Sequence, residues 1–278
     1  MSDSYARRTA RSDSATRSTP LVAEREPRGA RRRRETRSRL LEAALRLMAE
    51  KGMEGVAINE ITEAADVGFG SFYNHFESKE AIYAAILEWV FDDFANAMEA
   101  VLGDIADPAE IIAVSTRYTV TRALRDPVWG RFLVREGFSA GSMDHGLGRR
   151  LLRDIRKGMA AKRLTVSDPL MSFVSVGGTT LGAISLALQL DSPQGQAVTF
   201  KELGSDLEHL PERVAKVALE VLGLGRAEAE KIAYRPLPAV EPTTAAAGLG
   251  AGKASAMPRS PEAGPKRKTS GRKATSGG

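Results

Sequence analysis

The sequence predicts an all-α protein with a basic segment at each end. Along its 278 residues, apolar side chains recur at the i, i+3, i+4 and i+7 spacing of an amphipathic helix. No stretch alternates apolar and polar residues between hairpin turns, which is the pattern of a half-buried strand. The chain has no Cys, and this excludes disulfides, thiolate metal sites and Cys nucleophiles.

Capping and turn residues place the helices in order. Thr36 is a suitable N-cap for the first helix and Gly52 lies just past its end, while Ser78 begins a long fourth helix. Pro108 suits the first turn of the next one, because a helix start tolerates the missing N–H. The expected helices cover residues 36–51, 58–65, 69–76, 78–102, 108–126, 128–136, 147–162, 169–190, 206–222 and 226–233.

Charge is distributed unevenly along the chain. The net charge is +5, but residues 1–39 hold 12 Arg against 5 acidic residues and residues 251–278 hold 7 basic residues against one acidic residue. The body between them is acidic. Such polar ends bury too little surface to offset their ordering entropy, so we expect a disordered arm over residues 1–34 and a disordered tail over residues 236–278. Basic ends favour nucleic acid as a partner.

The segment over residues 169–190 has no charge and is long enough to span a bilayer. It also contains Gly177, Gly178 and Gly182, and Asp168 and Asp191 flank it without the Lys/Arg bias of a membrane helix. We interpret it as a buried helix and expect no membrane segment.

Residues 137–141 match the G-x-S-x-G pattern of a hydrolase nucleophile, with Ser139 at its centre. That motif needs a strand before it, whereas the preceding residues have a helical pattern. An esterase acting through Ser139 is an alternative that this context disfavours, and we expect no enzyme. The three His residues lack a metal-ligand spacing, so we expect no metal and no cofactor.

The two short helices over residues 58–65 and 69–76 have the lengths and apolar spacing of a helix-turn-helix. Its second helix must bury one side and present small polar and aromatic groups to DNA on the other. Phe72 and Phe76 suit the buried side.

Residue strings 40–45, 49–52, 61–65, 70–76 and 78–80 together resemble the DNA-binding domain of TetR/AcrR-type transcriptional regulators. The resemblance covers about fifty residues. It implies a DNA-binding domain over residues 35–83, followed by a helical effector-binding and dimerisation domain over residues 84–235. It also implies DNA contacts by the following residues: Thr36, Arg37, Phe69, Ser71, Tyr73, Asn74, His75 and Lys79.

Three departures from the family pattern concern this domain. Val56 and Ala57 replace a usual Thr/Ser pair, which removes a cap unless Asn59 or Glu60 substitutes for it. Asp66 replaces a turn Gly, and Asp tolerates the left-handed conformation better than most residues. Phe69 at the tip of the recognition helix favours contact with thymine methyl groups, and therefore an altered sequence preference.

The second domain is expected to hold an apolar effector, although aromatic residues at helical spacing also fit an ordinary core. Candidate pocket residues are Trp89, Arg117, Tyr118, Thr121, Trp129, Phe138, Met159 and Phe173. For dimerisation, the resemblance implies a four-helix interface, and small or apolar residues of the last two long helices suit it, with buried packing within one chain as the competing explanation. The candidates there are Gly178, Gly182, Ala218 and Val221.

We therefore predict a homodimeric transcriptional repressor that a small apolar effector releases from a palindromic DNA operator. Its expected partners are double-stranded DNA, a second copy of the chain and the unidentified effector, in the cytoplasm. The alternative from another class is a nucleoid-type protein that binds DNA non-specifically through its basic tails.

Overall fold

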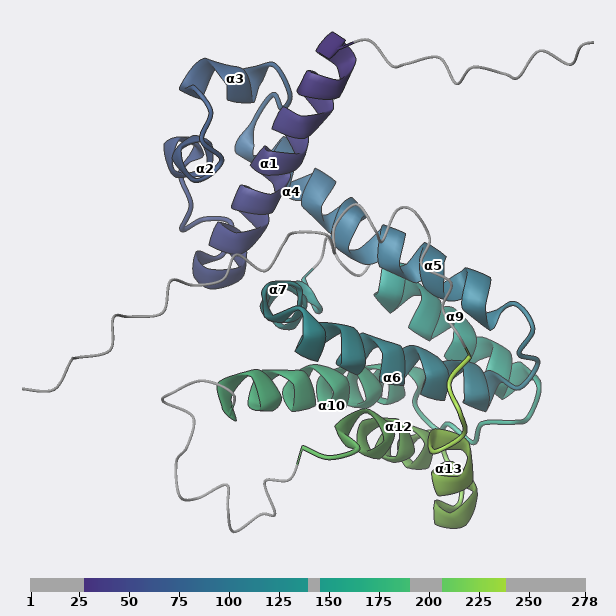
Figure 1. The fold of residues 1–278 in the computed structure, drawn as a ribbon. Helices are drawn as coiled ribbons and strands as arrows, with labels where there is room; N and C mark the ends of the chain where they lie inside the picture. Colours follow the sequence, from purple (N-terminus) through teal and green to yellow (C-terminus); the bar gives the residue numbers. More distant parts are fainter. Residues whose placement is uncertain (1–27, 140–145, 191–206, 239–278) are drawn as a thin grey trace, which may run out of the picture.

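The computed structural model describes residues 28–139, 146–190 and 207–238, and within them every regular element is a helix. The all-α prediction is confirmed. Figure 1 shows α1, α2 and α3 at one end, the helices from α6 onward at the other, and α4 to α5 running between them. The helices are α1 (Arg28–Lys51), α2 (Ile58–Ala64), α3 (Phe69–Tyr73), α4 (Lys79–Leu87), the π-helical turn η1 (Glu88–Asp92), α5 (Asp93–Leu102), α6 (Pro108–Arg125), α7 (Pro127–Glu136), α9 (Gly146–Ala160), α10 (Pro169–Leu190), α12 (Leu210–Val221) and α13 (Arg226–Ala233).

The first helix begins eight residues earlier than predicted. Thr36 lies inside α1 and is not its N-cap, and residues 28–34 are helical and not a disordered arm. Arg is a good helix former, and Arg31 pairs with Glu35 one turn later at 2.7 Å. The rest of the predicted arm, and the predicted tail from residue 239 onward, lie outside the described residues.

The third and fourth predicted helices also differ in detail. Residues 74–76 leave the helix and form a turn, in which the N–H groups of His75 and Phe76 both donate to the Phe72 carbonyl. The long fourth helix is continuous from α4 to α5, but η1 inserts a wider turn into it. Such single π-helical turns occur frequently at functional sites.

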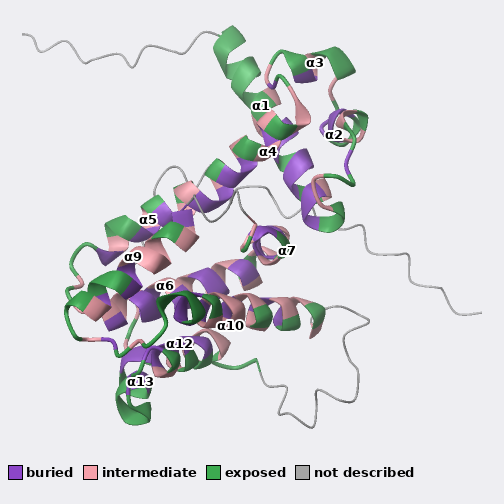
Figure 2. Cartoon of the chain, turned by 180° about the vertical axis from the view of Figure 1, so that it is seen from behind, coloured by how far each residue is buried: buried purple, intermediate pink, exposed green. Residues whose placement is uncertain are grey.

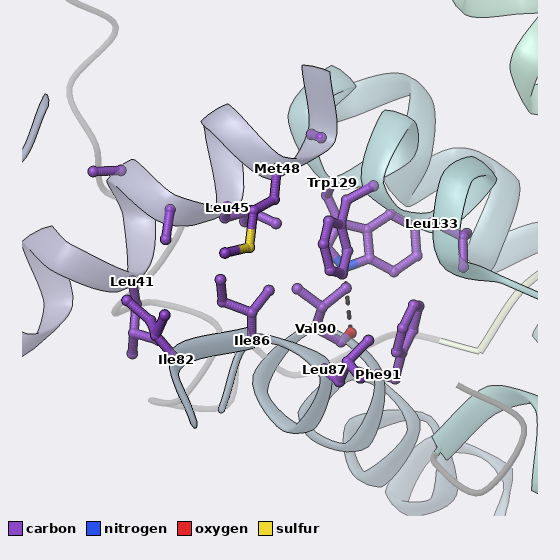
Figure 3. Close-up of a cluster of buried hydrophobic side chains, with 14 of the residues drawn as sticks. Leu41, Leu45, Met48, Ile82, Ile86, Leu87, Val90, Phe91, Trp129 and Leu133 are labelled. Carbon is purple, nitrogen blue, oxygen red and sulfur yellow. Dashed lines mark hydrogen bonds between the residues drawn. The ribbon is translucent and has the colours of Figure 1, made fainter. Parts of the chain in front are cut away.

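One hydrophobic core joins the N-terminal helices to the rest of the chain. Met48 of α1 and Ile86 of α4 are fully buried in the same cluster as Trp129 of α7 (Figure 3). The indole N–H of Trp129 donates to the carbonyl of Val90 in η1 at 3.3 Å. The predicted boundary near residue 83 therefore falls within a shared core.

Helix α10, which the sequence predicts to be buried, is buried along one face. Phe173, Val176 and Ile184 face the interior, whereas Figure 2 shows other parts of the helix exposed. By length and composition alone, α10 could cross a membrane. Most of its apolar stretch is also not buried within the described part of the chain. It packs against α6, α7, α9 and α12, as a helix of a folded domain does.

Candidate nucleic-acid interface and effector cavity

The turn between α2 and α3 depends on Asp66. Its φ is +52°, in the left-handed region that the sequence predicts for this position. The next N–H, that of Val67, donates back to the Thr62 carbonyl at 3.0 Å and closes the end of α2. Arg39 of α1 donates to the Asp66 carbonyl at 3.4 Å, which ties the turn to the first helix.

The missing cap of α2 is replaced by Glu60. The Glu60 carboxylate accepts from the Ala57 N–H at 2.9 Å and from the Lys51 ammonium at 2.6 Å. The bond from Lys51 has the largest effect, and with the bond from Ala57 it holds the pKa of Glu60 below its usual value. The sequence-based expectation that Asn59 or Glu60 would substitute for the usual cap is confirmed for Glu60.

Helix α3 has the two faces that DNA reading requires. Phe72 is fully buried and Phe76 nearly so. Phe69 and Tyr73 are instead 54% and 52% exposed, and their rings meet edge to face with centroids 5.6 Å apart. Two exposed aromatic rings on a helix of five residues form a protruding, partly apolar surface that suits the floor of a groove.

A hollow separates α3 from the N-terminal turns of α1. Within it, the Arg33 guanidinium donates to the Asn74 carbonyl at 3.3 Å. Burial lowers the pKa of His75, and the charges of Arg33 and Arg37 lower it further, so neutral His75 is favoured. Guanidinium, hydroxyl and amide donors together suit a phosphate. The hollow is lined by Gly29, Arg32, Arg33, Thr36, Ser71, Asn74 and His75.

Arg37 and Lys79 lie beside this surface. The Arg37 guanidinium carbon stands 5.1 Å from the centroid of the Phe76 ring, a cation–π arrangement. Lys79 opens α4 behind the N-cap Ser78, whose hydroxyl accepts from the Ala81 N–H at 3.2 Å. The Lys79 ammonium lies 3.7 Å from the exposed carboxylate of Glu54. All eight predicted DNA contacts thus come from α1, α3, the turn after α3 and the start of α4.

Hydrogen bonds from α4 and from η1 connect this region to the larger domain. The Tyr83 hydroxyl donates to the Glu136 carboxylate at 2.5 Å; burial and this carboxylate raise the pKa of Tyr83 to about 12. The Asp92 carboxylate accepts from the Gly146 N–H at 2.6 Å, at the first residue of α9. Hydrogen bonds to α7 and to α9 therefore stabilise the connection between the two domains.

A cavity of about 110 Å³ lies between α5, α6, α9 and α10. Its walls are mainly apolar, and the Phe138 and Phe173 rings meet edge to face on one side with centroids 6.2 Å apart. At another edge stand the charged side chains of Arg150, Arg153 and Asp154. Apolar walls with a few polar groups are typical of a small-molecule site.

Only two of the predicted pocket residues, Phe138 and Phe173, line this cavity. Arg117 instead binds Glu212 at 2.6 Å and the Arg235 carbonyl, which anchors the end of the described chain. Trp129 is a core residue, and Trp89 lies in a separate depression beside α1. Three further predicted residues, Tyr118, Thr121 and Met159, are also absent from the lining. Helical spacing identified these side chains as inward-facing but did not show which of them border empty space.

Of the predicted dimer residues, three are accessible to a partner chain and one is not. A Cβ added to Gly178 or Gly182 would meet nothing within 4 Å, and Val221 is 40% exposed. Ala218 is fully buried within the chain, where α12 packs against α6, and is unavailable to a partner. Val217, one residue earlier, is exposed in its place.

Sequence reasoning missed Arg32 and Arg33 as part of the surface beside α3, and Arg150 and Arg153 as part of the cavity. Arg32 and Arg33 fell in the segment expected to be disordered. Arg150 and Arg153 lie in the predicted helix over residues 147–162, and helical spacing alone does not show which of its charged side chains border a cavity. A signal was present only for the first pair, as a run of Arg directly before a recognised motif.

Two family descriptions match the chain: "Bacterial regulatory proteins, tetR family" over residues 40–86, and "Tetracyclin repressor-like, C-terminal domain" over residues 107–235. Over 72 residues the chain is 42% identical to the HTH-type transcriptional repressor DhaR of Mycobacterium sp. (strain GP1), a match that covers 26% of this chain and 36% of DhaR. The HTH-type transcriptional repressor AcnR of Corynebacterium glutamicum is 28% identical over 167 residues, 53% of this chain and 86% of AcnR.

The chain spans less than half the length of the first curated relatives that it matches. Among solved structures, RolR in complex with resorcinol is 34% identical with a TM-score of 0.53, and the match covers 76% of this chain and 100% of that chain. The chain therefore belongs to the tetR family of bacterial regulatory proteins, which are DNA-binding transcription factors and not enzymes.

Proposed function

We propose that this protein is a transcriptional repressor that reads a DNA operator with α3 and its flanking residues. The observation that carries the proposal is the exposed face of Phe69 and Tyr73 next to the hollow shared with α1. Ser71 and Asn74 supply hydrogen-bonding groups for base edges and phosphates, and Lys79 and Arg37 supply charge for the backbone on either side. The curated relatives DhaR and AcnR, both named repressors, support this function.

We propose that the active form is a homodimer in the cytoplasm. Leu170, Val174 and Leu186 are exposed on α10, and together with Gly178 and Gly182 they form a stripe with a four-residue repeat. The exposed side chains of Val217 and Val221 extend this stripe onto α12. A stripe of this kind suits a helix pair from a second copy, and two copies would read two half-sites one turn of DNA apart, about 34–36 Å.

We propose that a small effector binds in the cavity and lowers the affinity for DNA. A cavity of this size is on the scale of engineered cavities that accept a single ring. RolR, whose described complex contains resorcinol, supports a small aromatic effector. The effector would favour one arrangement of α4 over another, since the helix is continuous from the recognition region to the cavity wall.

Footprinting on DNA that flanks the protein's own gene tests the proposal. We expect protection of a two-fold symmetric site, and loss of that protection in Tyr73→Ala and Asn74→Ala. The variant Glu77→Ala, at an exposed neighbouring position, serves as the control and should protect the site as the wild type does. Uniform protection without a preferred site would contradict a sequence-specific repressor and favour non-specific binding through charge.

A further inference from the structure

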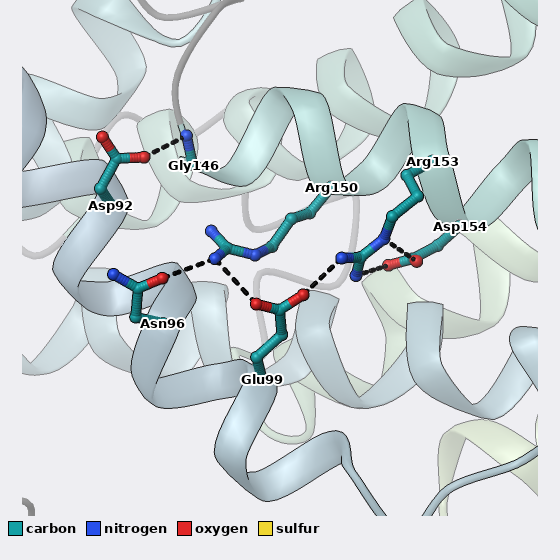
Figure 4. Close-up of polar contacts among 7 residues, drawn as sticks. All are labelled: Asp92, Asn96, Glu99, Gly146, Arg150, Arg153 and Asp154. Carbon is teal, nitrogen blue, oxygen red and sulfur yellow. Dashed lines mark hydrogen bonds and ion pairs between the residues drawn. The ribbon is translucent and has the colours of Figure 1, made fainter.

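The two arginines at the edge of the cavity are held by one carboxylate from the opposite helix. Arg150 Nη2 lies 3.0 Å from Glu99 Oε2, and Arg153 pairs with the other oxygen of the same carboxylate (Figure 4). Hydrogen bonds from Arg150 and Arg153 lower the pKa of Glu99 to about 2. The pair of guanidinium groups is therefore arranged to bind a carboxylate.

Glu99 can leave this arrangement more easily than Arg150 can. Its side chain is 45% exposed, so a displaced carboxylate regains water. The Arg150 side chain is only 19% exposed, and without Glu99 its charge would stay at the cavity edge without that partner. The Arg150 guanidinium therefore still favours an anionic partner when the Glu99 carboxylate is displaced.

The other polar groups of the lining offer fewer donors. The Thr119 hydroxyl donates to the Ser115 carbonyl and the Thr180 hydroxyl to the Val176 carbonyl, both at 2.8 Å, so these oxygens are left as acceptors. The third charged group, Asp154, is buried and engaged by Arg153 at 2.9 Å. A ligand group that accepts hydrogen bonds is therefore bound best by the guanidinium groups of Arg150 and Arg153 at the cavity edge.

We propose that the cavity takes a small, largely apolar carboxylate, such as an aromatic acid, whose carboxylate replaces Glu99 on Arg150 and Arg153. The proposal rests on the proposed function, in which this cavity is the effector site. The apolar part of the ligand would lie against the Phe138 and Phe173 rings.

The exchange also gives the ligand a route to the DNA-binding end. Glu99 and Asn96 both lie on α5. The Glu99 pairs, together with the hydrogen bond that Arg150 donates to the Asn96 side-chain oxygen at 2.7 Å, hold α5 against α9. Breaking the Glu99 pairs loosens this clamp, and α5 is joined through η1 to the preceding helix α4, which begins with Lys79. Release of α5 would therefore allow α4 to shift against the recognition region.

Calorimetric titration of the full chain with benzoate, and with benzamide as its neutral counterpart, tests the proposal. We expect benzoate to bind at least tenfold more tightly than benzamide. Arg150→Met should abolish this preference, whereas Arg149→Met, an exposed neighbour on the same helix, should keep it. Glu99→Gln should bind benzoate more tightly than the wild type, a gain that misfolding cannot produce.

Equal affinities for benzoate and benzamide would overturn the proposal, as would equal effects of the two Arg variants. So would the absence of binding by benzoate, phenylacetate, 4-hydroxybenzoate and salicylate alike. The proposed function fails separately, if the unliganded wild-type protein protects no operator. In that case the calorimetric titration would still test the preference for carboxylates, because it does not depend on DNA binding.

Discussion

Asp66 shows how one backbone angle sets the geometry of the recognition region. Its left-handed conformation allows α2 to end and α3 to leave at an angle, and Arg39 holds the same residue through its carbonyl. Glu60 acts at the other end of α2, where it replaces a missing side-chain cap. Both effects depend on residues that are close in sequence, so the sequence alone predicts them.

Replacing Asp66 by Val should destabilise the protein by about 1–2 kcal/mol, because a β-branched side chain is strained in the left-handed region. Asp66→Gly should be tolerated, since Gly adopts this conformation freely. Urea denaturation followed by circular dichroism measures the difference. Equal midpoints for the Val and Gly variants would show that the turn is not conformationally demanding.

At the scale of elements, ion pairs and a hydrogen bond join α5 to α9 beside the cavity. Arg150 and Arg153 reach across from α9 to Glu99, and the Asp92 carboxylate accepts from the first N–H of α9. Apolar packing tolerates small shifts poorly, whereas partly exposed ion pairs can be exchanged with water or a ligand. This contact is therefore suited to change when a ligand binds.

The contribution of Glu99 to stability should depend on pH. Its pKa in the folded chain, about 2, lies below its usual value of 4.5, so the stabilisation is present above about pH 4.5. It is lost as the pH falls through the interval from 4.5 to 2 and Glu99 becomes protonated. Urea midpoints of the wild type and of Glu99→Gln should differ at pH 7, and the difference should shrink below pH 4.5 and vanish towards pH 2. A constant difference across this range would contradict the assignment.

A large charged side chain on the exposed stripe of α10 should prevent dimerisation without unfolding the chain. Gly178→Arg meets open space within its own chain, but it would stand between two closely approaching helices. Gly225→Arg is the matched control, because that position is also open and lies outside the stripe. Light scattering after size-exclusion chromatography should show a monomer for the first variant and a dimer for the second. A dimeric Gly178→Arg would place the interface elsewhere.

For the whole molecule, the structure changes the meaning of the basic N-terminal segment. Of the 12 arginines in residues 1–39, seven lie in α1, together with only one of the five acidic residues. The positive charge is thus mounted mainly on a helix beside the recognition surface. The first 27 residues, with five Arg and four acidic residues, carry almost none of the excess.

Deleting residues 1–27 should therefore change the salt dependence of DNA binding little. Replacing Arg32 and Arg33 by Ala should reduce the slope of log K against log salt by about 1 for each lost phosphate contact. Arg28→Ala, outside the hollow, is the control. Fluorescence anisotropy with operator DNA at several salt concentrations gives the slopes. A deletion effect as large as that of the two substitutions would move the electrostatic contact into the N-terminal arm.

The sequence by itself determined the helical fold, the helix-turn-helix, the family and the cap and turn residues of α2. These features rest on local periodicity, on capping chemistry or on a dense motif, all of which can be read within a few turns of helix.

The tertiary structure alone decided which inward-facing residues border the cavity, why Ala218 is unavailable to a partner, and why Arg117 anchors the chain end while Arg150 lines the cavity. A helical repeat shows which side chains share a face. What that face meets depends on contacts between helices that are far apart in the chain, and no local pattern records those contacts.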